Sequence, residues 1–350
     1  MLYNFPATGY NWKMAVKTDT INWALAGTGG ISNKFITGLK ATEGRAAAAV
    51  SRNMETARNF AANNGIEKAF DDYDRMLEDT AIDVVYIGTP HTTHKDLAIR
   101  ALKAKKAVLC EKPCAINAGE LKEMIQTARE NNVFFMEAMW PRFTPPFEKV
   151  REWLSNDFIG EVLMVEANFG YNAPFDPHHR LFDPALGGGA LLDAGIYPLS
   201  LISMAFGGKK PEAITSRVYL GQTGVDEQAA VLLSYGESRM AYAGTSMRTS
   251  MTTDAWIYGT KGKIYIPNFV WARSAELLAD GKQRLEFTPA NFIANGYNYE
   301  AEEVMHCLKA GKTESAVMPW DESILLMETI DTIRAQWNFR YPSESIALRH

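Results

Sequence analysis

Short apolar runs alternate with helix-like segments between residues 21 and 139, and this alternation constrains the fold more than any other feature. The apolar runs fall at 21–26, 45–51, 84–88, 107–110 and 133–136. Segments with helical spacing of apolar residues separate them, at 32–40, 54–63, 73–78, 93–103 and 118–131. Strands and helices that alternate in this way form βαβ units with right-handed crossovers. We therefore expect an α/β domain with a doubly wound parallel sheet over residues 20–139.

The pattern changes after position 140. Three prolines interrupt it, a helix is expected at 147–154, and strand-like runs follow at 161–171, 213–220, 227–235, 239–245, 254–259, 263–266, 276–278 and 284–287. Glycines between the runs mark turns, and two final helices are expected at 299–310 and 322–339. Residues 140–340 are thus predicted to form an α+β domain on a large, mainly antiparallel, open-faced sheet. Residues 1–19 would be an N-terminal extension, with Met14 as an alternative start.

Composition narrows the class of protein. A length of 350 residues favours two domains, and a net charge of −5 argues against a nucleic-acid surface. We find no apolar stretch near the ~20 residues of a membrane span and no signal sequence in the first nineteen residues. Cys110, Cys114 and Cys307 form no disulfide framework, so we expect a cytoplasmic protein. Cys110 and Cys114 read better as buried thiols than as half of a metal site.

The turn that follows the first apolar run is the first candidate site. It reads Gly-Thr-Gly-Gly-Ile-Ser from Gly27 to Ser32, so it keeps only two glycines of the pattern G-x-G-x-x-G. Taken alone, a structural turn explains it equally well. A strand before it and a helix after it favour a Rossmann dinucleotide site, because the helix N-terminus would face the pyrophosphate.

The end of the second strand predicts which dinucleotide is used. NAD sites usually carry an acid there, whereas this strand ends in Ser51 and Arg52. Arg52 suits a 2′-phosphate, although it could instead be a surface residue that caps the next helix. We expect NADP, with NAD as the alternative. The cofactor contacts that we expect are Gly27, Thr28, Gly29, Gly30, Ile31, Ser51, Arg52, Thr89, Pro90, His94, Glu111, Lys112 and Arg142.

Two further segments follow buried strands and open toward the same sheet edge. In the first, His91 and His94 stand three residues apart. Without a carboxylate cluster they suit hydrogen bonding better than metal binding, and we expect no metal. In the second, Lys112 lies between Glu111 and a proline directly after an apolar run. Such a lysine is either a solvated charge or a group aimed at a ligand, since open α/β sheets bind ligands at this edge.

Four motifs together resemble the glucose–fructose oxidoreductase/inositol dehydrogenase (Gfo/Idh/MocA) family over residues 20–340. They are Gly-x-Gly-Gly-Ile from Gly27, Thr-Pro-x-x-x-His from Thr89, Glu-Lys-Pro from Glu111, and the run Gly-Gly-Gly-Ala-Leu-Leu-Asp-Ala-Gly-Ile-Tyr from 187 to 197. Residues 137–143 and the Asp-x-Gly-x-Tyr motif look most similar to the branch of dihydrodiol dehydrogenases and NADP-dependent xylose dehydrogenases. The chain departs from many members at His91, Pro141 and Tyr197, which leaves the substrate open.

The resemblance implies the chemistry. It implies a cis Lys112–Pro113 bond, and it makes Lys112, Asp193 and Tyr197 catalytic, with Lys112 and Tyr197 as the acid/base pair. A hydride would pass between NADP and a CH–OH group of a sugar, polyol or related diol, while a base takes the hydroxyl proton. Asp193 would orient the pair, and the sequence does not divide the proton between Lys112 and Tyr197. The substrate contacts that we expect are Trp140, Phe169, Tyr171, His179, Asp193 and Tyr197.

Alternative functions come from different classes. Oxidation of trans-dihydrodiols is a second enzymatic interpretation, and a non-catalytic NADP-sensing regulator is a third. A regulator would be expected to lack Lys112, Asp193 or Tyr197, and all three are present. We also expect a homodimer or dimer-based tetramer that forms through the outer face of the second sheet. That face is predicted to carry Val231, Leu233, Tyr242, Trp256 and Tyr258.

Overall fold

The computed structural model describes residues 20–236 and 238–346. The predicted extension 1–19, with Met14, lies outside the described residues. Six parallel strands form the first sheet, in the order β3-β2-β1-β4-β5-β6. Their bounds are β1 Asn22–Ala26, β2 Arg45–Val50, β3 Lys68–Phe70, β4 Val84–Ile87, β5 Ala107–Glu111 and β6 Phe135–Ala138. The Rossmann-type domain is therefore confirmed, and β3 is a short strand that the sequence did not indicate.

Helices cover both faces of this sheet, which is why its strands are continuous apolar runs. They are α1 Gly30–Leu39, α2 Met54–Asn64, α3 Tyr73–Leu77, α4 His94–Lys103 and α5 Ala118–Asn131. The strand order reverses at β1, which pairs with β2 on one side and β4 on the other. Ligands bind at such a reversal, beyond the carboxyl ends of the strands. The topology thus brings the segments after β1, β4 and β5 to one edge.

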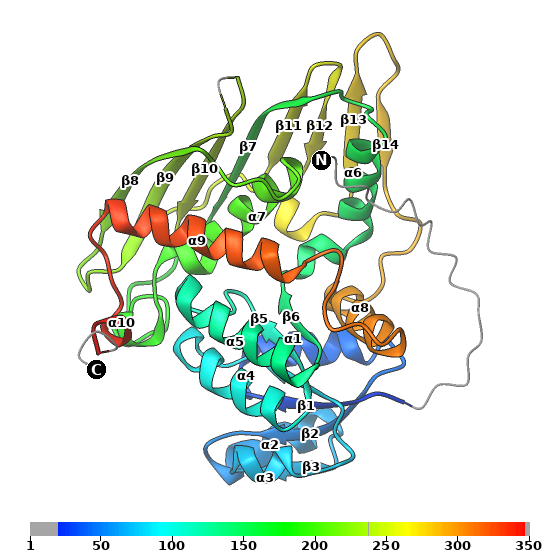
Figure 1. The fold of residues 1–350 in the computed structure, drawn as a ribbon, viewed down its shortest axis with the longest axis vertical. Helices are drawn as coiled ribbons and strands as arrows, with labels where there is room; N and C mark the ends of the chain where they lie inside the picture. The colour runs from blue at the N-terminus through cyan, green and yellow to red at the C-terminus, as the bar shows by residue number, and fades with distance from the viewer. Residues whose placement is uncertain (1–19, 237, 347–350) are drawn as a thin grey trace.

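Eight strands form the second sheet, in the order β14-β13-β12-β11-β7-β10-β9-β8. Only β7 and β10 run parallel, so the sheet is mainly antiparallel as expected. The strands are β7 Val162–Gly170, β8 Ala213–Leu220, β9 Asp226–Ser234, β10 Met240–Ser246, β11 Ala255–Gly259, β12 Gly262–Ile266, β13 Ala275–Ala279 and β14 Leu285–Phe287. Figure 1 shows this sheet above the first domain, with helix α9 (Trp320–Gln336) between the two.

The later helices join the two halves of the chain. Helices α6 (Pro145–Ser155), α7 (Ile196–Ala205) and α9 lie against the second sheet, whereas α8 (Tyr297–Lys309) packs against α1. The approach of α8 is close, since a Cβ atom on Gly38 would lie 2.6 Å from the backbone nitrogen of Asn298. The short helix α10 (Pro342–Ile346) ends the described chain. The C-terminal helices therefore hold the second domain against the first.

One helical segment, Pro184–Ala205, is long and apolar enough to span a membrane by length and composition alone. The sequence-based statement that no stretch approaches this length is therefore wrong. In the structure 89% of its apolar window is buried inside the protein, as in the core helix of a globular domain.

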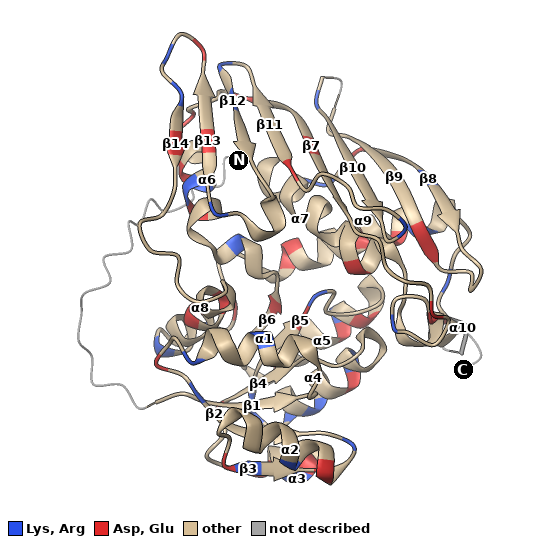
Figure 2. Ribbon diagram, turned by 180° about the vertical axis from the view of Figure 1, so that it is seen from behind, with Lys and Arg blue, Asp and Glu red and all other residues tan. Residues whose placement is uncertain are grey.

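The outer face of the second sheet differs from the prediction. Val231 and Leu233 are 1% and 2% exposed, so they face the core. Leu232 and Met240 are each 57% exposed and lie on the opposite face, where Leu232 pairs with Tyr242 across the strands. The side chains of β9 do alternate between the two faces of the sheet, but Val231 and Leu233, which were predicted to lie on the outer face, lie on the core face. Figure 2 shows that charged residues are sparse along most of these strands compared with the helices of the first domain.

Candidate active site

Lys112 lies directly after β5, at the reversal edge of the first sheet, and the Lys112–Pro113 peptide is cis. Its side chain is only 11% exposed, so the amine does not point into solvent. The Nζ atom donates a hydrogen bond to the backbone carbonyl of Asp193 at 2.7 Å and lies 4.6 Å from the centroid of the Tyr197 ring. The structure therefore brings together the three residues that the sequence analysis named as catalytic.

The Asp193 carboxylate is the centre of a buried ionic cluster. Oδ1 accepts a hydrogen bond from Arg180 at 2.8 Å and lies 3.8 Å from Lys112 Nζ. Oδ2 accepts a hydrogen bond from the Tyr171 hydroxyl. Burial by itself would raise the pKa of Asp193, but Lys112 and Arg180 outweigh it and hold the pKa below its ordinary value. Asp193 is therefore ionised and positions the groups around it.

Burial shifts the pKa values of Lys112 and Tyr197 in opposite directions. It lowers the pKa of Lys112, because desolvation disfavours the ammonium form by more than Asp193 favours it. It raises the pKa of Tyr197 well above the usual value, because desolvation disfavours the phenolate. The lysine thus gives up its proton more readily than a solvated lysine, while the phenol keeps its own.

A π-helical turn, Leu191–Gly195, carries Asp193 into α7, which begins at Ile196. Asp193 and Tyr197 are four residues apart, a spacing that would place them on one face of an ordinary α-helix. The wider turn changes that geometry and leaves the Asp193 carbonyl beside Lys112 Nζ. Single π turns inside helices occur often at functional sites.

Aromatic side chains surround Tyr197. The Phe169 ring packs edge-on against Tyr197 at 5.6 Å between centroids, and Trp271 packs edge-on against Phe169 at 5.3 Å. Trp140 stacks on Tyr297 at 5.0 Å. Trp271 is 44% exposed, so one aromatic edge of this group reaches solvent. Such walls suit the apolar faces of a sugar ring or an arene.

The glycine turn after β1 has the shape that a dinucleotide requires. Gly27 has a φ of +102°, and a Cβ atom there would lie 2.7 Å from the carbonyl oxygen of Gly88. At Gly29 and Gly30 a Cβ atom would meet nothing within 4 Å. Helix α1 begins at Gly30 without a side-chain cap, so its first N–H groups are free to bind an anion. These residues therefore fit a pyrophosphate.

The segment after β4 is held by two histidines with different charges. Both ring nitrogens of His94 lie 2.9 Å from carbonyl oxygens, those of Thr89 and Pro113. A carbonyl oxygen only accepts hydrogen bonds, so both ring nitrogens must donate and His94 is an imidazolium. Burial opposes this charge, but Cys110 and the carbonyls outweigh it and raise the pKa of His94 to about 9. Burial and the neighbouring His94 lower the pKa of His91 to about 3, so His91 is neutral.

This geometry revises the expected role of His94. The side chain is fully buried and its two nitrogens are both engaged by backbone. It therefore ties the segment after β4 to the loop after Lys112 and acts on a cofactor only through them. His91 Nδ1 lies 3.1 Å from the carbonyl oxygen of Gly187, in the glycine run that precedes Asp193.

Ser51 and Arg52 lie at the end of β2, and Arg52 is exposed. Asn53, not Arg52, caps α2, with its side chain accepting from the backbone nitrogen of Thr56. Arg52 has no hydrogen bond or ion pair to the other described residues. The helix-capping alternative for Arg52 is thus excluded, and its charge is available to a ligand.

Two predicted contacts lie elsewhere. Arg142 is 2% exposed and donates to the Ser200 hydroxyl at 2.8 Å and to Glu322 at 2.6 Å. It is a core residue of the second domain, and the expectation that it contacts the cofactor is wrong. His179 is exposed and accepts from the backbone nitrogen of Leu181. The next residue, Arg180, reaches the site instead and donates a hydrogen bond to Asp193 Oδ1 at 2.8 Å.

Two buried residues near the site were not predicted. Tyr297 and Glu300 come from α8, far along the chain, and Glu300 adds to the burial that raises the pKa of Tyr197. Glu300 is fully buried with no hydrogen-bond partner among the described residues, and burial raises its pKa well above the usual value. Neither position belongs to a recognisable motif, so the sequence carries no signal for this contact, which arises from the packing of α8 on α1.

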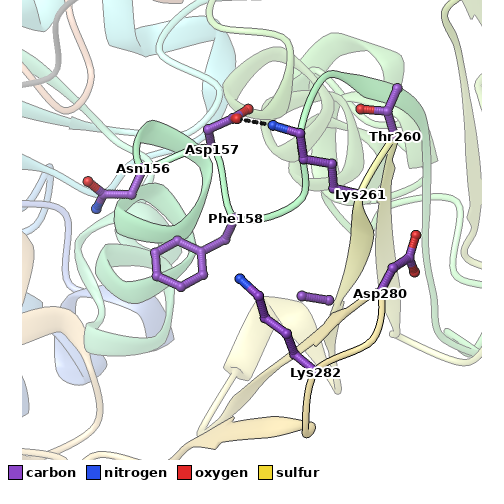
Figure 3. A pocket seen from close by; sticks show the side chains of 8 residues that line it. Asn156, Asp157, Phe158, Thr260, Lys261, Asp280 and Lys282 are labelled. Carbon is purple, nitrogen blue, oxygen red and sulfur yellow. Dashed lines mark hydrogen bonds and ion pairs between the residues drawn. The ribbon is translucent and has the colours of Figure 1, made fainter.

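A separate cavity of about 510 Å³ lies at the far end of the second sheet. Figure 3 shows its lining, which comes from the turn after α6 and from the loops after β11 and β13. Lys261 and Asp157 form an ion pair at its rim. None of the candidate site residues named above lines this cavity.

Comparison with known proteins decides the family. Residues 21–139 match the family described as "Oxidoreductase family, NAD-binding Rossmann fold", and residues 147–265 match the "GFO/IDH/MocA C-terminal domain". The chain belongs to the Gfo/Idh/MocA oxidoreductase family. It is 38% identical over 332 residues to a trans-1,2-dihydrobenzene-1,2-diol dehydrogenase from Xenopus tropicalis, covering 91% of this chain and 99% of that protein. This member of the Gfo/Idh/MocA family is thus an oxidoreductase that acts as a dehydrogenase.

Solved structures agree on the fold. A 3-ketoreductase from Actinomadura kijaniata in complex with NADP and TDP-benzene superimposes with a TM-score of 0.80 at 21% identity, covering 91% of this chain and 98% of that chain. A levoglucosan dehydrogenase in complex with NADH and levoglucosan gives a TM-score of 0.81 at 20% identity, covering 91% and 97%. The Gfo/Idh/MocA fold therefore occurs with both kinds of dinucleotide among these neighbours.

Proposed function

We propose that this protein is an NADP-dependent dehydrogenase that oxidises a CH–OH group of a sugar, polyol or related cyclic diol. The observation that carries the proposal is the position of Lys112. Its amine is buried at the carboxyl edge of the first sheet, bound to the Asp193 carbonyl at 2.7 Å and 4.6 Å from the Tyr197 ring centroid. A buried amine with a lowered pKa at a dinucleotide edge suits base catalysis.

The two members of the acid/base pair take different parts in this proposal. Lys112, whose pKa is lowered by burial, accepts the proton of the substrate hydroxyl during oxidation. Tyr197, whose pKa is raised by burial, stays protonated and donates a hydrogen bond to the same oxygen. Asp193 stays ionised and orients Lys112. When bound, the nicotinamide supplies the acceptor for the hydride.

The choice of NADP rests on Arg52. Its exposed guanidinium stands at the end of β2, where NAD sites usually carry an acid. Gly29, Gly30 and the uncapped start of α1 would hold the pyrophosphate. Thr89 and the loop after Lys112, tied together through His94, would border the nicotinamide side.

Oxidation of a trans-dihydrodiol is the second candidate, and it is favoured by the relative at 38% identity. The aromatic group of Phe169, Trp271 and Tyr197 suits an arene as well as a sugar.

Purified protein with NADP should be offered aldoses, polyols and trans-1,2-dihydrobenzene-1,2-diol while NADPH absorbance is followed. Turnover of any of these supports a CH–OH dehydrogenase, and their relative kcat/KM selects the class. No turnover with any of them, despite tight NADP binding, would favour a nucleotide-sensing regulator.

We further propose that two copies associate through the outer face of the second sheet, in a reducing, cytoplasmic environment. The face carries an apolar patch, and exposed patches of this kind often mark interfaces. The three cysteines are free and buried, as suits a reducing compartment. Light scattering of the purified chain tests the association. The patch residues are Met164, Leu232, Met240, Tyr242, Trp256, Tyr258 and Tyr265.

A further inference from the structure

Arg180 is an arginine on an exposed loop that reaches a buried carboxylate. Its side chain is 48% exposed, while the Asp193 side chain to which it binds is 10% exposed. We propose that Arg180 is a positioning residue that keeps Lys112 available as a base, by occupying the Asp193 oxygen that would otherwise pair with the lysine. This inference rests on the function proposed above and assigns Arg180 a part in it.

The distances around Asp193 show the competition. Oδ1 lies 2.8 Å from Arg180 but 3.8 Å from Lys112 Nζ. Oδ2 is taken by the Tyr171 hydroxyl. Lys112 binds the neutral backbone carbonyl of Asp193 instead, at 2.7 Å. The lysine is therefore fixed beside the carboxylate without a close ion pair to it, which is the arrangement a base requires.

The positive charge of Arg180 also favours the neutral form of Lys112, which is the form that can act as a base. A positive group near an amine disfavours its protonated form, and Arg180 lowers the pKa of Lys112 in this way. Burial is the larger cause, and Asp193 acts in the opposite direction. The titratable and charged groups that face Lys112 come from six elements: Glu111 on β5, Glu137 on β6, His91 after β4, Asp193 on the π turn, Tyr197 on α7 and Arg180 on the loop after β7.

Removing the charge at position 180 should have two effects, and both should raise the pKa of Lys112. The repulsion on the lysine disappears, and the freed Asp193 oxygen can pair closely with Lys112. Both favour the ammonium form, so the pKa of Lys112 should rise by about one unit. If the amine is the base, kcat/KM for oxidation below that pKa should fall about tenfold, because one pH unit changes the neutral fraction tenfold.

The test compares full-length wild type, Arg180→Gln and Arg180→Lys. Glutamine is neutral and shorter than arginine, so it leaves the Asp193 oxygen without its ionic partner, and lysine keeps the charge. Trace acetylation with acetic anhydride between pH 6 and 10.5, quantified on the Lys112 peptide by mass spectrometry, measures the lysine pKa without any turnover. The exposed Lys209 in the same digest is the internal reference.

The expected result is a Lys112 midpoint about one unit higher in Arg180→Gln, with Arg180→Lys near wild type. The same midpoint in all three proteins would overturn the proposal. So would an equal shift in both variants, because the effect would then depend on the guanidinium shape and not on its charge. If the acetylation midpoint shifts as expected but the pH profile of turnover does not follow it, the effect of Arg180 on the Lys112 proton stands and the proposed base function of Lys112 fails.

Discussion

Replacement of Gly29 by alanine should weaken dinucleotide binding and leave the fold intact. The backbone at Gly29 has a φ of −80° and a ψ of −176°, which any residue adopts, and a Cβ atom there meets nothing within 4 Å. The free energy of unfolding should therefore change by less than about 1 kcal/mol. The added methyl group would occupy the space in front of α1, where a phosphate approaches the first N–H groups. Loss of one charge-assisted hydrogen bond costs about 1.5–3 kcal/mol, so Kd for NADPH should rise roughly 10–150-fold.

Two measurements on the same protein separate these effects. Thermal unfolding without ligand reports stability, and NADPH titration followed by tryptophan fluorescence reports Kd. Gly38→Ala is the matched control, because its Cβ atom would lie 2.6 Å from the backbone nitrogen of Asn298 and must disturb the contact of α1 with α8. It should lower stability with a much smaller effect on Kd. An unchanged Kd in Gly29→Ala would refute the placement of the pyrophosphate.

Three further predictions concern the cofactor, the sheet face and the glycine run. Arg52→Ala should weaken NADP binding about 10–100-fold and leave NAD binding nearly unchanged; equal losses for both nucleotides in parallel titrations would show that Arg52 does not bind the 2′-phosphate. Leu232→Asp, at a residue 57% exposed on the sheet-face patch, should shift the chain to monomers in light scattering; an unchanged mass would place the interface elsewhere. Gly189→Ala should lower the free energy of unfolding by about 2–5 kcal/mol, since φ is +127° and the Cβ atom would lie 2.2 Å from Asp226, which binds the Leu191 nitrogen. Gly207 also has a positive φ, but a Cβ atom there would meet nothing within 4 Å, so Gly207→Ala should lower the free energy of unfolding by only about 1–2 kcal/mol. Equal losses for the two variants in urea denaturation would show that the contact with Asp226 is not the cause of the larger effect at Gly189.

The sequence determined most of the fold because its signals are local. A buried parallel strand is a short apolar run between turn residues, and β1, β2, β4 and β5 end within a residue or two of the predicted positions. The strand β3 has only three residues at a sheet edge and gave no such run. The strand β9 reads Ala-Ala-Val-Leu-Leu from 229 to 233, which is apolar on both faces. Alternation alone therefore could not tell which face meets the core.

The site was predictable where residues follow strand ends and not where it depends on distant packing. Lys112 and the glycine turn sit where the topology of parallel strands places them. Arg142 looked available because arginine is usually exposed, yet Ser200 and Glu322, far along the chain, bury it. The choice between His179 and Arg180 depends on how one loop folds over Asp193. The π turn before Tyr197 leaves no periodic pattern in the sequence.

The most direct test of the account is hydride transfer in a single turnover of Lys112→Met with saturating NADP and an accepted substrate. Methionine is similar in length but carries no proton-accepting amine. The account predicts NADPH formation slower by about 10²–10⁴-fold, with Kd for NADPH close to wild type. A single-turnover rate near that of the wild type would contradict the assignment of Lys112 as the base.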